Sequence, residues 1–89
     1  MSARQIIVHG RVQGVCFRAS ARDMAVALGL TGRVCNQSDG TVRLWVEGTD
    51  EAVSAMTEWC RTGPPRAEVD RVEVEESLPI GMSDFRVER

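Results

Sequence analysis

Lysine is absent from this chain of 89 residues, and all eleven lysine-or-arginine positions are arginines. A chain without lysine cannot form a Schiff base, and it cannot build the P-loop, in which a lysine contacts nucleotide phosphates. One histidine and three scattered cysteines also fall short of the ligand cluster that a metal hydrolase needs. We therefore expect neither a metal nor another cofactor.

Long apolar stretches are missing as well. No stretch approaches the roughly 20 apolar residues of a membrane span, and the N-terminus lacks the basic and then apolar segments of a secretory signal. The odd number of cysteines (Cys16, Cys35 and Cys60) favours reduced thiols over a disulfide framework. The expected protein is cytoplasmic and has no membrane partner.

Charge is divided unevenly along the chain, whose net charge is −2. Residues 1–46 contain six arginines and two acidic residues, whereas residues 47–89 contain five arginines and eleven acidic residues. A basic half in an acidic protein suits a small anionic ligand better than a nucleic acid, because nucleic-acid-binding domains usually carry an overall positive charge. We expect a small anion as the ligand and no nucleic-acid partner.

The hydrophobic pattern changes between strand and helix periods along the chain. Between residues 20 and 30 apolar side chains recur at helical spacing, and Ser20 with Asp23 offers a capping box at the start of this helix. Thr49 or Asp50 offers a cap for a second helix. The expected strands cover residues 5–12, 33–37, 41–48, 69–76 and 85–87, and the expected helices cover residues 20–30 and 50–61.

This order of elements is that of the ferredoxin-like split-βαβ sandwich, βαββαβ. It predicts a single α+β domain over residues 1–89, with an antiparallel sheet and two helices on one of its faces. The third strand is expected to bury one face, because Val42, Leu44 and Val46 alternate with Arg43, Trp45 and Glu47. RNA-binding modules share the topology, but they stack bases on aromatic residues of the central strands. Here only Trp45 is expected to face outward, which does not suit that function.

Residues 10–18, with the sequence GRVQGVCFR, carry the information about function, because they join the first strand to the first helix. The N–H groups that start a helix have no intrahelical partners, and the helix dipole favours negative charge there. Gly14 allows the loop to curl so that several N–H groups point at one anion, and the guanidinium of Arg18 matches phosphate oxygens. A simple turn at Gly14 and a solvated Arg18 would account for the same residues, and for isolated motifs that outcome is the commoner one.

The stretch GRVQGVCFR resembles the signature of the acylphosphatase family. Further segments match the family in order over nearly the whole chain, namely residues 29–32, Val34 with Asn36, and residues 39–42, 47–48, 63–67 and 85–87. The resemblance implies a monomeric enzyme that hydrolyses acyl phosphates to a carboxylate and inorganic phosphate without a metal. Its partner is then a small acyl phosphate, and inorganic phosphate or sulfate should occupy the same site.

The resemblance also assigns roles to residues of this chain. It implies that the substrate phosphate is bound by a guanidinium and loop amides, that a carboxamide orients the attacking water, and that the substrate accepts the water's proton. The implied phosphate-binding residues are Gly14, Val15, Cys16, Phe17 and Arg18, and the implied catalytic residues are Arg18 and Asn36. Without the resemblance, Asn36 would be interpreted as a strand-end residue before a turn.

Three alternatives remain from the residues. Cys16 beside Arg18 could act as a thiolate nucleophile, although no general acid is recognisable. A non-catalytic anion-binding module would need Arg18 but has no reason to keep Asn36. A carbamoyl-phosphate-handling domain of larger hydrogenase-maturation proteins would be accompanied by zinc-finger or transferase segments, which this sequence lacks. The chain differs from many family members at Ala19, Arg33 and Cys35, and these differences leave both implied catalytic residues in place.

Overall fold

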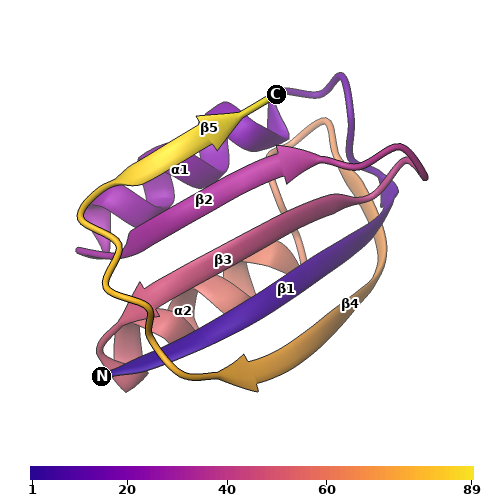
Figure 1. Cartoon of the computed structure of the whole chain (residues 1–89). Helices are drawn as coiled ribbons and strands as arrows, with labels where there is room; N and C mark the ends of the chain where they lie inside the picture. The colour runs from indigo at the N-terminus through magenta and orange to yellow at the C-terminus, as the bar shows by residue number, and fades with distance from the viewer.

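A computed structural model describes all 89 residues, and it contains five strands and two helices (Figure 1). In chain order the elements are β1 (Ser2–Arg11), α1 (Phe17–Ala27), β2 (Thr31–Asn36), β3 (Val42–Gly48), α2 (Asp50–Cys60), β4 (Glu68–Ser77) and β5 (Phe85–Glu88). The predicted strands are all present, with ends that differ from the predicted ones by no more than three residues.

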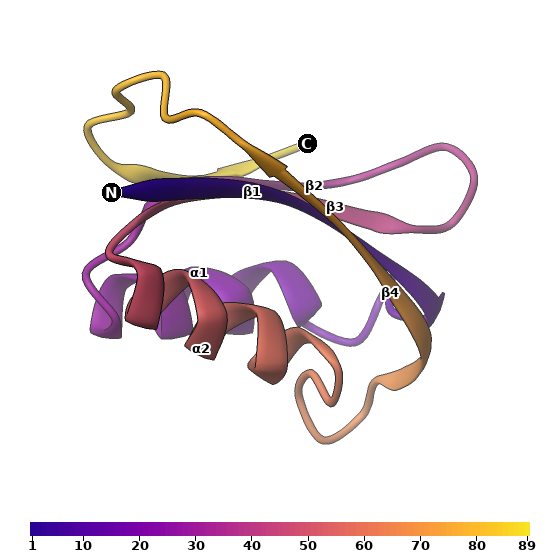
Figure 2. The ribbon, with the colours of Figure 1, turned by 90° about the horizontal axis from the view of Figure 1, so that it is seen from below.

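The strands form one sheet in the order β4-β1-β3-β2-β5. The pairs β1–β4, β1–β3 and β2–β3 are antiparallel, whereas β5 lies parallel to β2. Both helices cover the same face of the sheet (Figure 2). The predicted ferredoxin-like α+β fold is confirmed, with one correction: the fifth strand makes the sheet mixed rather than antiparallel throughout. The parallel pairing arises because the β4–β5 connection carries the chain back across the sheet before β5 begins.

The core lies between the sheet and the two helices. On β3, Val42, Leu44 and Val46 are fully buried, as their alternation predicts. They lie in one apolar cluster with small and medium side chains of the helices, such as Ala25 of α1 and Met56 of α2. The small residue on α1 lets the helix backbone approach the sheet closely, and burial of each larger side chain stabilises the fold by about 1.5–3 kcal/mol.

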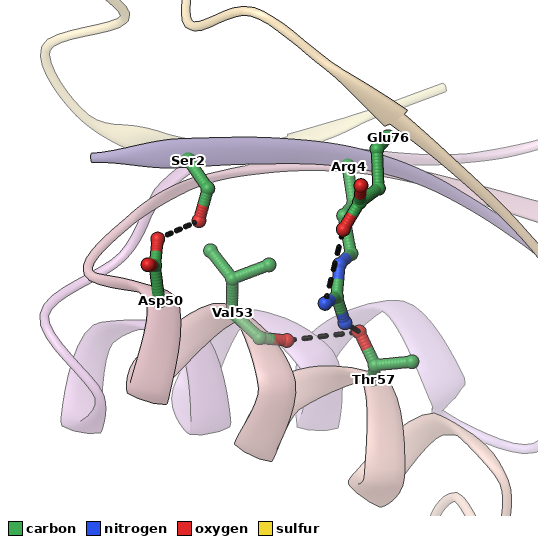
Figure 3. A network of polar contacts seen from close by, with 6 residues as sticks. All are labelled: Ser2, Arg4, Asp50, Val53, Thr57 and Glu76. Carbon is green, nitrogen blue, oxygen red and sulfur yellow. Dashed lines mark hydrogen bonds and ion pairs between the residues drawn. The ribbon is translucent and has the colours of Figure 1, made fainter.

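Polar contacts join α2 to the first residues of β1 (Figure 3). Ser2 Oγ donates to Asp50 Oδ1 at 2.6 Å, and Arg4 Nη1 donates to Thr57 Oγ1 at 3.1 Å. The Thr57 hydroxyl in turn donates to the carbonyl oxygen of Val53 at 2.8 Å. The helix itself starts with the predicted cap, since the Thr49 hydroxyl accepts from the N–H of Ala52 at 3.2 Å.

Helix α1 begins and ends three residues earlier than the pattern predicts. Its N-cap is Cys16, which has a φ of 62° and makes no side-chain cap hydrogen bond. The capping box expected from Ser20 and Asp23 is wrong, because Ser20 lies inside the helix and donates its N–H to the Cys16 carbonyl at 3.0 Å. The start of the helix is set by Phe17, which is 2% exposed and belongs to the core.

Candidate functional site

Two residues in the left-handed region curl the loop between β1 and α1. Gly14 has a φ of 76°, and Cys16 has a φ of 62° and is the only residue other than glycine with a positive φ. The left-handed conformation costs a non-glycine residue roughly 1–2 kcal/mol, and such strain is found mostly at functional sites. Left-handed residues in a turn direct neighbouring N–H groups toward one point, which is the geometry of an anion-binding nest.

The N–H groups of this loop are not used by the fold. Hydrogen bonds outside the helices and strands do not include the N–H groups of residues 14–19 as donors. The first amides of α1 also have no intrahelical acceptor, and the helix dipole places partial positive charge at this end. A row of unused donors at a helix N-terminus is suited to bind an anion.

The loop is held to the core on its helical side. The Phe17 ring lies 5.3 Å from the Trp59 ring of α2, centroid to centroid, in a tilted arrangement. Adjacent to it, Arg18 is half-buried in the first turn of α1. Because Phe17 cannot leave the core without exposing its ring, the backbone from Cys16 to Arg18 has a fixed position.

Arg18 is held by backbone rather than by a carboxylate. Its Nη1 donates to the carbonyl oxygen of Glu88 in β5 at 2.9 Å. None of the ion pairs of the structure includes Arg18. A guanidinium has five N–H donors and keeps its charge at any physiological pH. Arg18 therefore presents an uncompensated positive charge in a defined orientation.

A pocket of about 360 Å³ opens beside these groups. It brings together residues from the loop, from α1, from the end of β2 and from β5. The lining residues are Val12, Gly14, Cys16, Phe17, Arg18, Ala19, Asn36 and Val87. Of the predicted site residues only Val15 does not line it, because its partly buried side chain packs against the core.

Asn36 is the last residue of β2 and faces this pocket from the hairpin that joins β2 to β3. The turn of this hairpin is stabilised by Asp39, whose Oδ1 accepts from the Thr41 N–H at 3.0 Å and from its hydroxyl at 2.6 Å. These hydrogen bonds lower the pKa of Asp39 below its ordinary value. The Asn36 carboxamide takes no part in them, so it is free to bind a ligand or a water.

Gln13 links the loop to the hairpin, a contact that the sequence analysis did not identify. Its Nε2 donates to the carbonyl oxygens of Gln37 at 2.8 Å and Thr41 at 2.9 Å. The residue that precedes Gly14 is thereby joined to the residue that follows Asn36. The position of Gln13 within GRVQGVCFR was the only signal for it in the sequence.

The lining residues set the chemistry that is possible in the pocket. They include no histidine, aspartate or glutamate, and no three His, Cys, Asp or Glu side chains gather anywhere in the structure closely enough to hold a metal. The donors are amides, a carboxamide and a guanidinium, which bind anions. Separately, neither helix has the length and the apolar character that a membrane crossing requires.

Comparison with known proteins identifies the family. The family model described as "Acylphosphatase" matches residues 4–87, which is nearly the whole chain. The chain belongs to the acylphosphatase family. Among curated acylphosphatases, the one from Mesorhizobium japonicum is 55% identical over 86 residues, which cover 96% of this chain and 92% of that protein. The acylphosphatase from Pelotomaculum thermopropionicum is 51% identical over 70 residues, or 79% of this chain and 76% of that protein.

Solved structures agree with this assignment. The crystal structure of acylphosphatase from Bacillus subtilis matches with a TM-score of 0.97 and 36% identity, and the match covers both chains completely. A full-length HypF crystal structure in the phosphate- and nucleotide-bound form matches with a TM-score of 0.91 and 31% identity, over 99% of this chain and 12% of that one. The fold and the family membership predicted from the sequence are both confirmed, and the chain is an enzyme of the acylphosphatase family.

Proposed function

We propose that this chain hydrolyses acyl phosphates by direct attack of a water, oriented by Asn36, on a phosphate held by the amides of residues 14–18 and by Arg18, without a metal. Family membership supports the reaction, and the geometry of the pocket supports the residue roles. The observation that carries the proposal is the uncompensated guanidinium of Arg18 next to a row of unused loop amides.

The reaction needs little from the protein beyond binding and orientation. The leaving group is a carboxylate, whose conjugate acid has a pKa of about 4, so it departs without a protein acid. Transfer of a phosphoryl group depends mainly on positioning and on stabilisation of charge at its oxygens. The pocket supplies this with Arg18 and the loop amides, and its lining includes no histidine or carboxylate.

Asn36 suits the role of a water-binding residue. A carboxamide accepts one hydrogen bond from a water and donates another, and it does not change charge with pH. The proton of the attacking water then passes to a phosphate oxygen of the substrate. Because Asn36 lies at the end of β2 and Arg18 on α1, attack and phosphate binding come from different elements of the fold.

Benzoyl phosphate hydrolysis, followed by loss of ultraviolet absorbance in the presence of EDTA, tests this function. Arg18→Gln should abolish both turnover and inhibition by inorganic phosphate, because it removes the only charge in the site. Arg22→Gln, on the exposed face of the same helix, is the matched control and should retain both. Phosphate binding by the unmodified protein without turnover would favour the non-catalytic module instead.

Asn36→Ala separates water orientation from phosphate binding. Turnover should be lost while inorganic phosphate still inhibits or binds with unchanged affinity, since Arg18 and the loop are intact. Gln37→Ala is the control, because the Gln37 side chain makes no hydrogen bond and only its backbone N–H and carbonyl are used. Equal loss of turnover and phosphate affinity in Asn36→Ala would contradict the proposed role.

We further infer that the protein acts as a monomer in the cytoplasm, on a small acyl phosphate rather than on a nucleic acid. All three cysteines are unpaired and Cys16 is exposed, which suits a reducing compartment. Trp45 lies on the face of the sheet that the helices do not cover, where RNA-binding modules stack bases. Its indole N–H donates to Glu47 Oε2 at 2.7 Å, so the ring is held in place rather than available for stacking. Light scattering of the purified protein would measure the oligomeric state.

A further inference from the structure

Glu47 is a buried carboxylate outside the phosphate pocket. It lies near the end of β3 on the face that the helices do not cover, and it is 1% exposed. A carboxylate is rarely buried unless its oxygens are fully hydrogen-bonded. Glu47 has no arginine partner, so its burial requires another explanation.

The explanation is a group of backbone donors in the β4–β5 connection. Glu47 Oε2 accepts from the Ile80 N–H at 2.9 Å, and Oε1 accepts from the N–H groups of Gly81 and Met82 at 3.1 and 3.2 Å. With the indole of Trp45, four donors occupy the four acceptor positions of the carboxylate. Burial raises the pKa of the Glu47 carboxyl, but these hydrogen bonds lower it by more, so the net pKa is below its ordinary value.

The connection has few other attachments. Leu78 and Ile80 are 82% and 66% exposed, so their side chains contribute little packing. Apart from the bonds to Glu47, the backbone of residues 78–84 is tied to the rest of the protein by Asp84, whose carbonyl accepts from the Gly32 N–H at 2.8 Å. Figure 2 shows the connection on the face opposite the helices, and in Figure 1 it crosses the end of β3.

Strand β5 begins directly after this connection and ends at the phosphate pocket. It pairs with β2 from Gly32↔Phe85 to Cys35↔Glu88, and the carbonyl of Glu88 holds Arg18. Figure 1 shows the C-terminus beside the start of α1. The strand has only four residues and pairs on one side only, so besides its pairing with β2 and the packing of Phe85 against the core, the anchoring of the connection helps to set its position.

We propose that Glu47 is a positioning residue for Arg18, which acts by anchoring the amides of residues 80–82 and thereby fixing where β5 presents the Glu88 carbonyl. This proposal deepens the proposed function and rests on it, because the proposed function is what assigns Arg18 to phosphate binding. Glu47 lies at the opposite end of β3 from the pocket and acts through β5 rather than on the substrate.

Gly81→Ala tests the anchor from the side of the connection. Gly81 has a φ of 84°, and an added Cβ would meet no atom within 4 Å, so the substitution strains the loop without a clash. Gly29→Ala is the matched control, because Gly29 has a φ of 74° and equally open surroundings but no contact with Glu47. Both loops are exposed, so both variants should fold.

The measurements are the KM for benzoyl phosphate, the inhibition constant of inorganic phosphate, and the proton–nitrogen NMR signals of the Arg18 guanidinium without ligand. Glu47→Gln and Gly81→Ala should shift the Arg18 signals and raise both constants about 2- to 30-fold, the range of coupling through connected elements. Gly29→Ala should leave the Arg18 signals and both constants unchanged. Glu76→Gln, on exposed β4, is the control for loss of a carboxylate and should also leave them unchanged.

Unchanged Arg18 signals in folded Glu47→Gln and Gly81→Ala proteins would overturn the proposal. Should Glu47→Gln not fold, Gly81→Ala decides alone. Shifted Arg18 signals with unchanged kinetic constants would uphold the positioning role and contradict the part of Arg18 in the proposed function. If Glu47 has a purely structural role, Glu47→Gln will lower the melting temperature without shifting the Arg18 signals or raising the KM and the inhibition constant.

Discussion

Replacement of Gln13 by alanine should weaken both the fold and the site, because this side chain makes two hydrogen bonds to one hairpin. A hydrogen bond in a protein contributes about 0.5–1.5 kcal/mol net, so two contribute about 1–3 kcal/mol. The cost is not larger, because each carbonyl keeps a second donor. Gly40 N–H donates to the Gln37 carbonyl at 3.1 Å, and Gln37 N–H donates to the Thr41 carbonyl at 2.9 Å.

The loss of activity in Gln13→Ala should exceed what the loss of stability explains. Gln13 precedes Gly14 in the loop, and its acceptor Gln37 follows Asn36, so the side chain helps to set the distance between the proposed phosphate and water sites. A displacement of about 1 Å between reacting groups lowers the rate about 100-fold. We therefore expect kcat/KM for benzoyl phosphate to fall by about 10- to 100-fold at a temperature where the variant is fully folded.

Thermal unfolding and steady-state kinetics measure the two effects on the same samples. The melting temperature should fall by about 4–8 °C for each kcal/mol lost in a domain of this size. Gln37→Ala is the control, since it removes a glutamine side chain from the hairpin but keeps the carbonyl that Gln13 uses.

Gln13→Glu extends the test with an isosteric side chain. The introduced carboxylate would face two carbonyl oxygens, so this variant should be less stable than Gln13→Ala at neutral pH and should recover as the carboxylate is protonated. Equal effects of Gln13→Ala and Gln37→Ala on melting temperature and on kcat/KM would refute the reasoning.

Three further changes have defined outcomes. Cys16→Ser should keep its turnover of benzoyl phosphate, whereas an inactive but folded variant would support the alternative in which Cys16 acts as a thiolate nucleophile. Glu47→Gln should lower the free energy of unfolding by about 1.5–3 kcal/mol at neutral pH. The folded-state pKa of Glu47 is lowered, so its contribution is complete above the unfolded carboxyl pKa and is lost as the pH falls through the folded value. Urea unfolding should therefore show the two proteins converging in acid, and a constant difference would contradict this. Thr49→Ala should cost about 1 kcal/mol through loss of the α2 cap, while Thr62→Ala, just beyond α2, should cost less.

The sequence predicted the parts of the fold that depend on local periodicity. The alternation in β3 placed Val42, Leu44 and Val46 in the core, and Thr49 caps α2 as expected. The start of α1 was missed, because the spacing of apolar residues does not reveal that Cys16 adopts a left-handed conformation. The capping residues Ser, Thr, Asp and Asn are a guide only where the helix has an ordinary N-cap.

Long-range contacts account for the remaining differences. Alternation placed Glu47 opposite the buried face of β3, yet it is buried, because the β4–β5 connection returns over that face and supplies donors from residues 80–82. The parallel pairing of β5 with β2 has the same origin. A one-dimensional pattern reports the period of a segment, and it does not report which distant segment covers it.

The composition of the candidate site could be predicted, but its supports could not. Arg18, Asn36 and most of the loop line one pocket, as the resemblance implied, and their roles stay predictions. The groups that hold them are the Gln13 side chain and the Glu88 carbonyl. A backbone carbonyl carries no sequence signal at all, because every residue type presents one.

The features that equip the pocket to bind an anion also make it a weak contributor to stability. Arg18 is half-buried without a counter-ion, the amides of residues 14–19 lack protein acceptors, and Cys16 holds a strained backbone. A tetrahedral anion bound as proposed would compensate the charge of Arg18 and supply acceptors for the amides. The surroundings therefore have to hold the pocket in shape while it is empty. Phe17 in the core, Gln13 across the loop and β5 paired with β2 lie around the pocket and hold the segments that line it.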